Sequence, residues 1–103
     1  MSQSFSLDDI RAAAEAQYGH TEVAGATLQN VMRLSREKRI EFSKMREKLD
    51  EAEDASDVLE EMLRMVAVPG KAIDDLIEAC AGDLGMLMTV FTRYSEGTQV
   101  GEA

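Results

Sequence analysis

The sequence predicts an all-α protein, a small bundle of about five helices in which residues 20–34 form either a short β-hairpin or an extended loop. Two observations lead to this prediction. Apolar residues recur every three or four positions over most of the chain, as they do on one face of an amphipathic helix. Ser, Asp, Gly and Pro interrupt this pattern at intervals typical of helix ends. The 103 residues are enough for one hydrophobic core.

The first predicted helix begins after Ser6, whose hydroxyl can cap it, and two aspartates follow where the helix dipole favours negative charge. Gly19 is expected to end this helix in a left-handed turn. Beyond it, residues 21–23 and 27–29 alternate on either side of an Ala-Gly-Ala sequence. This alternation is typical of a hairpin, but an extended loop fits it as well.

Ser35 is expected to cap the second helix, which carries most of the positive charge of the chain. The acidic stretch 50–57 follows, and within it Asp54 or Ser56 can cap a third helix. The opposed charges of the second helix and this stretch have two interpretations. They form either an antiparallel pair within one molecule or complementary patches between molecules.

The third helix is expected to end at Pro69-Gly70. A fourth helix follows up to Cys80, residues 81–83 interrupt the pattern, and a fifth helix begins near Leu84. Residues 97–103 show no apolar stripe, and we expect them to form a flexible tail after a single helical domain at residues 1–96.

The apolar stripes also predict the core. They contribute Ile10, Phe42, Met45, Leu49, Leu59, Met62, Leu63, Val66, Ile73, Leu76, Ile77, Leu87 and Phe91. Cys80 lies on the stripe of the fourth helix, so we expect it to be a buried thiol. A lone cysteine cannot form an intramolecular disulfide, which fits a reducing compartment.

Composition and charge argue against several classes of function. The 20 acidic and 11 basic residues give a formal net charge of −9, which would repel nucleic acid. No apolar run approaches the ~18 residues needed to span a bilayer, and no signal peptide is present, so we expect no membrane partner. The sequence also lacks a phosphate-binding loop and paired cysteines. We therefore expect no catalytic site, no cofactor and no metal, with His20 a solvated residue.

Methionines are frequent in the C-terminal half, where their flexible side chains suit either an irregular core or an adaptable binding surface. The last helix also has apolar residues at 84, 86, 87, 88, 90 and 91, a face wider than one side of a small bundle covers. We therefore predict self-association and a partner-binding surface in this half. That predicted surface consists of Met62, Met65, Met86, Met88 and Phe91.

Three segments occur in an order that resembles the tail assembly chaperones of long-tailed (siphovirus) phages that infect actinobacteria. They are residues 6–19, residues 34–39 and residues 91–103. The last is the most specific, because Tyr-Ser-Glu at 94–96 is followed by Thr-Gln-Val-Gly-Glu-Ala at 98–103. From the first segment to the last, their order and spacing span nearly the whole chain.

The resemblance implies a helper without catalytic activity that binds the tape measure protein, keeps it soluble and assists assembly of the tail tube around it. Its expected partners are the tape measure protein, the tail tube protein and a longer, frameshifted form of the chain itself. The expected location is the cytoplasm of the host cell, with none of the protein in the mature virion. The alternatives are a small helical structural protein of the virion or a regulatory protein, the latter because the basic helix could enter a major groove.

Overall fold

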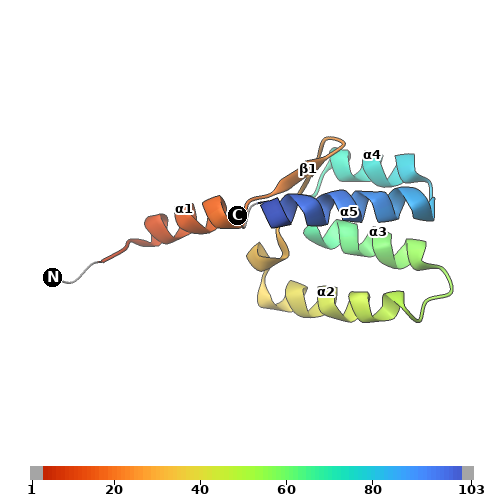
Figure 1. Ribbon diagram of the computed structural model, residues 1–103, viewed down its shortest axis with the longest axis horizontal. Coiled ribbons are helices and arrows are strands. Elements are labelled where there is room, and N and C mark those ends of the chain that lie inside the picture. The colour runs from red at the N-terminus through yellow and green to blue at the C-terminus, as the bar shows by residue number, and fades with distance from the viewer. Residues whose placement is uncertain (1–3, 101–103) are drawn as a thin grey trace.

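The computed structural model describes residues 4–100, which form five α-helices, one 3-10 helix and a two-stranded antiparallel hairpin (Figure 1). The predicted all-α bundle is confirmed, and the hairpin is the observed form of residues 20–34. In chain order the elements are α1 (Leu7–Gln17), β1 (Thr21–Val23), β2 (Ala26–Leu28), η1 (Val31–Arg33), α2 (Arg36–Leu49), α3 (Ala55–Val66), α4 (Lys71–Cys80) and α5 (Leu84–Val100).

The helices begin where the capping residues predict. The Ser6 hydroxyl accepts a hydrogen bond from the Asp9 amide at 3.1 Å, and the Asp9 carboxylate accepts one from the Ser6 amide at 3.0 Å. The Ser35 hydroxyl caps α2 by accepting a hydrogen bond from the Lys38 amide, and the Asp54 carboxylate caps α3 by accepting one from the Ser56 amide. The expected left-handed turn at Gly19 is wrong. Since α1 ends at Tyr18 with a φ of −121°, the chain passes directly into the extended direction of β1.

The hairpin is closed by a two-residue turn in which both residues have positive φ, 50° at Ala24 and 84° at Gly25. This is the turn geometry that matches the twist of two short strands. Leu28 is fully buried, and backbone hydrogen bonds join the end of α3 to the chain around β2, one of them from Gln29 N to Val66 O at 2.8 Å. The hairpin therefore forms one wall of the core.

Helix α3 lies at the centre of the body, packed on one side by α2 and on the other by α5 (Figure 1). Helix α4 packs against α3 and β2, while α5 also lies along β1. This arrangement places the end of α5 beside the start of the hairpin.

Most of the predicted core is confirmed. Met45, Leu49, Ile77 and Phe91 are half-buried and pack against the core, and Cys80 is buried. Its burial raises the pKa of the Cys80 thiol. The sequence analysis missed several further buried apolar residues: Ala26, Leu28, Leu34, Ala67, Val90 and Tyr94.

Ile10 is not a core residue, because α1 projects away from the body and buries no residue of its own (Figure 1). Its exposed fraction is 57 %. The projection lengthens the molecule to 58 × 27 × 25 Å, with a radius of gyration of 15.5 Å. A compact domain of this length would have a radius of about 13 Å. We call residues 5–17 the arm.

Helix α5 continues to Val100, beyond residue 96, where the sequence analysis expected the helical domain to end. At Gly97 the helix lies so close to Thr21 that an added Cβ would be 2.5 Å from the threonine Oγ1. Packing against β1 thus extends the helix beyond the point where its own weak helix formers predict an end. Residues 101–103 of the expected tail lie outside the described residues.

Candidate partner-binding groove

The five residues predicted to bind a partner do not form one surface. Met62 is buried at 3 % exposure and Met65 is half-buried against the core, so both have packing roles. Met86 and Met88 are exposed by 46 % and 53 %, but they lie on opposite sides of the buried stripe of α5. Met62, Met88 and Phe91 share one groove, Met86 lines a separate hollow, and Met65 lines neither.

The groove shared by Met62, Met88 and Phe91 lies between α2 and α5 and has a volume of about 340 Å³. Residues of α3 form its apolar floor, and α2 and α5 form its walls, because α3 separates these two helices (Figure 1). We call it the α2–α5 groove. It is lined by Asn30, Val31, Phe42, Arg46, Leu49, Leu59, Met62, Met88, Phe91, Tyr94 and Ser95.

Two aromatic residues fix the α5 wall of the groove. The rings of Phe91 and Tyr94 meet edge to face with centroids 6.4 Å apart. The Tyr94 hydroxyl donates a hydrogen bond of 2.6 Å to the Gln29 carbonyl oxygen. Burial raises the pKa of Tyr94 to about 12, against a smaller opposing effect of the Val31 backbone. Tyr94 therefore holds α5 to the segment after the hairpin and keeps this end of the groove in place.

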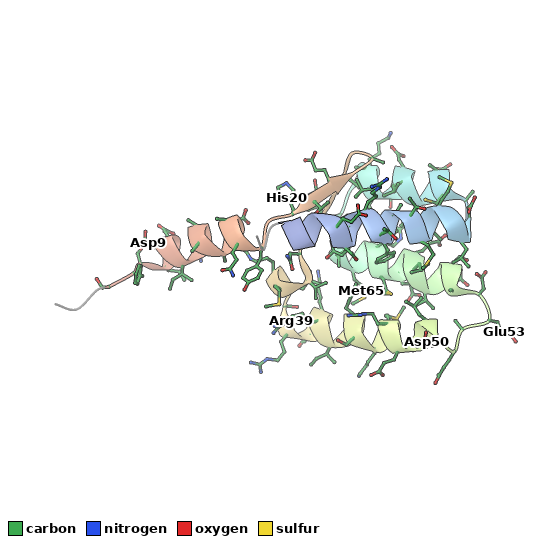
Figure 2. The ribbon with its side chains drawn as sticks, viewed as in Figure 1. Asp9, His20, Arg39, Asp50, Glu53 and Met65 are labelled. Carbon is green, nitrogen blue, oxygen red and sulfur yellow. The ribbon has the colours of Figure 1, made fainter. Side chains whose placement is uncertain are left out.

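Helix α2, which forms one wall of the groove, has a positive net charge. Helix α2 carries six basic and three acidic residues, and all six basic side chains are exposed. Among them, Arg46 lines the groove and Arg39 lies on the same helix nearer the arm (Figure 2). None of the ion pairs between the side chains that the structure describes involves α2. In that part of the chain, the charges of α2 and the acidic stretch therefore do not pair within the molecule.

The acidic stretch lies elsewhere. Figure 2 shows Asp50 and Glu53 at the end of the body opposite the arm. Asp54 caps α3, and hydrogen bonds from the Ser56 side chain and backbone lower the pKa of the Asp54 carboxyl. The loop therefore adds negative charge at one end of the molecule, away from the arm.

The hollow on the other side of α5 has a different character. It lies between the hairpin, α4 and α5, has a volume of about 600 Å³, and includes Val23, Leu76, Met86 and Val90. Its charged residue is Asp83, whose carboxylate accepts a hydrogen bond from the Met86 amide at 3.1 Å and so caps α5. The two sides of α5 thus present apolar surfaces next to charges of opposite sign.

His20 is exposed near the start of the hairpin (Figure 2). No group of three or more metal-ligating side chains occurs among the described residues. In the same range, no helix has the length and apolar character that crossing a membrane requires.

The sequence analysis missed two features of this surface. It did not assign Val31, Arg46 or Tyr94 to a binding site, although the spacing of Leu87, Phe91 and Tyr94 on one helix face was a signal for the third. The sequence analysis also predicted that the apolar face of α1, with Ile10, packs in the core. No signal in the sequence separated a helix packed on its own body from one that extends away from it.

The fold and the groove define a small helical protein with a partly apolar groove on its surface. Comparison with known families gives a more particular assignment. The whole chain, residues 1–103, matches a family described as mycobacteriophage tail assembly protein, and the chain belongs to this family. A tail assembly family is not a family of enzymes. No curated protein and no solved structure matches the chain.

Proposed function

We propose that this protein is a tail assembly chaperone of a long-tailed phage of actinobacteria, and that it holds a helical segment of the tape measure protein in the α2–α5 groove. The observation that supports this proposal is the groove itself, which has an apolar floor and a half-exposed methionine, Met88, on its α5 wall. Family membership in phage tail assembly gives the biological setting.

The chemistry of the groove suits an amphipathic helix. Such helices bind by laying an apolar face into an apolar groove, and methionine side chains adapt to clients of different shape. Exposed basic residues of α2, including Arg46, can meet acidic residues beside the apolar face of the client. The net charge of −9 keeps a client-bound complex soluble.

The test is co-expression with the tape measure protein of the same phage. The expected result is that the tape measure protein becomes soluble and copurifies with this chain. Replacing Met88 by Ser should weaken binding about fivefold, because covering the exposed half of a methionine contributes on the order of 1 kcal/mol. The matched control is Met86→Ser, the same change at a similarly exposed methionine on the other side of α5.

Circular dichroism of both variants confirms that the body is folded. Equal loss of binding by the two variants would show that the client does not depend on the groove. A tape measure protein that remains insoluble with this chain would contradict the chaperone function itself.

The proposed role places the chain in the host cytoplasm during assembly and leaves it out of the finished particle. The tail tube protein and a frameshifted, longer form of the chain are the further partners that the role implies. Mass spectrometry of purified virions tests this part of the proposal. A chaperone should be absent from them, whereas an abundant signal would favour a structural component of the virion.

A further inference from the structure

The arm is an amphipathic helix whose apolar side is largely exposed to solvent. Phe5, Leu7 and Ile10 are exposed by 70 %, 61 % and 57 %. A helix as short as the 11 residues of α1 is marginal in water without packing. The reciprocal hydrogen bonds between Ser6 and Asp9 stabilise the first turn of the helix. Packing of its exposed apolar side against another surface would stabilise it further.

We propose that the arm of one copy docks in the α2–α5 groove of a second copy. The lengths agree, because the apolar positions Leu7 to Ala14 and the groove wall from Met88 to Ser95 are each eight residues of helix, about 10 Å from first to last. The groove also has an apolar floor, against which the exposed apolar side of the arm can pack.

Charge favours this groove over the hollow on the other side of α5. The arm helix contains three acidic residues, Asp8, Asp9 and Glu15, and one basic residue, Arg11. Arg46 is the charged residue that lines the groove, and it belongs to a helix with six basic and three acidic residues, so this side attracts the arm. The hollow has an aspartate at its edge, which disfavours an acidic helix.

The direction of the arm favours a second copy over its own body. Figure 1 shows α1 pointing away from the other helices, and Figure 2 places Asp9 well outside the body. Glu15 forms an ion pair of 3.2 Å with Arg33 of η1, which ties the base of the arm in this direction. An arm that reaches a second molecule gives head-to-tail contacts, which build rings or open chains, unless two copies exchange arms reciprocally.

The experiment uses the full chain alone and measures its oligomeric state by sedimentation over a range of concentrations. Wild type should associate as concentration rises. The double variant Leu7→Ser/Ile10→Ser should shift association to at least about tenfold higher concentration, because it removes apolar contact. The matched control Ala12→Ser/Ala16→Ser changes the opposite face of the same helix and should associate as wild type does.

Mixing two variants tests the arm and the groove as the two partners of one contact. Met88→Glu places a negative charge in the groove and should also prevent association, whereas Met86→Glu on the other side of α5 should not. The arm variant keeps an intact groove and the groove variant keeps an intact arm. An equimolar mixture of the two should therefore form heterodimers at concentrations at which each alone is monomeric.

A wild-type chain that stays monomeric at every concentration would overturn the proposal, and so would a mixture that never forms heterodimers. Unchanged association of the arm variant would do the same. The inference rests on the proposed function only in that both use one groove, and this test contains no client. Measuring client binding in the Leu7→Ser/Ile10→Ser variant, where no arm competes, then tests the chaperone function separately.

Discussion

A substitution at Gly97 tests most directly how α5 packs against the hairpin. It lies near the end of α5, where the helix runs along β1 and its backbone approaches the side chain of Thr21. We expect Gly97→Ala to destabilise the protein, although alanine is the better helix former.

The magnitude follows from two opposing effects. Replacing glycine by alanine in a helix interior stabilises it by about 1 kcal/mol. The new Cβ, however, would lie 2.5 Å from Thr21 Oγ1, 2.6 Å from Cγ2 and 3.1 Å from Cβ. Rotation of the threonine side chain does not relieve the contact with its Cβ, and such overpacking costs about 1–3 kcal/mol. The net change should be a loss of about 1 kcal/mol.

Urea unfolding followed by circular dichroism measures this change in the free energy of unfolding. The matched control is Gly85→Ala in the first turn of the same helix, where the new Cβ meets only the end of the Asp83 side chain at 3.3 Å. We expect that variant to be as stable as wild type or slightly more stable. Adding Thr21→Ala to Gly97→Ala should restore part of the lost stability. If Gly97→Ala alone stabilises the protein, α5 does not pack on the hairpin as described.

Two further predictions concern Tyr94 and the hairpin turn. The pKa of Tyr94 is about 12 in the folded state and about 10 in the unfolded state, so its contribution is complete below pH 10 and is lost as pH rises from 10 to 12. Tyr94→Phe should therefore lower the free energy of unfolding by about 1 kcal/mol at neutral pH and reduce its fall above pH 10, whereas Tyr18→Phe should retain that fall. Ala24→Asn should stabilise the protein by about 0.5–1 kcal/mol, because asparagine tolerates the positive φ at this position better than alanine does. Chemical unfolding across pH tests the Tyr94 prediction, and a Tyr94→Phe variant more stable than wild type would refute it. Chemical unfolding at neutral pH tests the turn prediction, and an Ala24→Asn variant less stable than wild type would contradict it.

Local chemistry made much of the fold predictable. Ser6, Ser35 and Asp54 each cap the helix that the sequence assigns to them, because a capping side chain needs only its own neighbours. The apolar stripes of α3 and α4 likewise identify buried faces, since each helix of that pair has a single strongly apolar side.

What sequence could not predict depends on contacts between distant segments. Leu28 and Ala26 lie in a hairpin too short to show a pattern, and their burial depends on the end of α3 beside them. The apolar residues of α1 have the same spacing as those of a core helix. Helix α1 lies outside the core because of the direction that the chain takes at Tyr18, the residue that joins it to the body. The predicted binding methionines are divided for a similar reason, because the tilt of α5 on α3 decides which side each one faces.

Two described residues of the segment most specific for the family resemblance, Tyr94 and Gly97, have a structural role. Tyr94 bonds to the Gln29 carbonyl and Gly97 allows α5 to approach Thr21, so these two residues hold α5 against the hairpin. The groove wall formed by Met88 and Phe91 stands where it does because the far end of the same helix is fixed. A change at Gly97, which does not line the groove, should therefore reduce stability and partner binding together, whereas a change at the exposed Met88 should reduce binding while the body remains stable. These two variants thus distinguish positioning of the groove from contact within it.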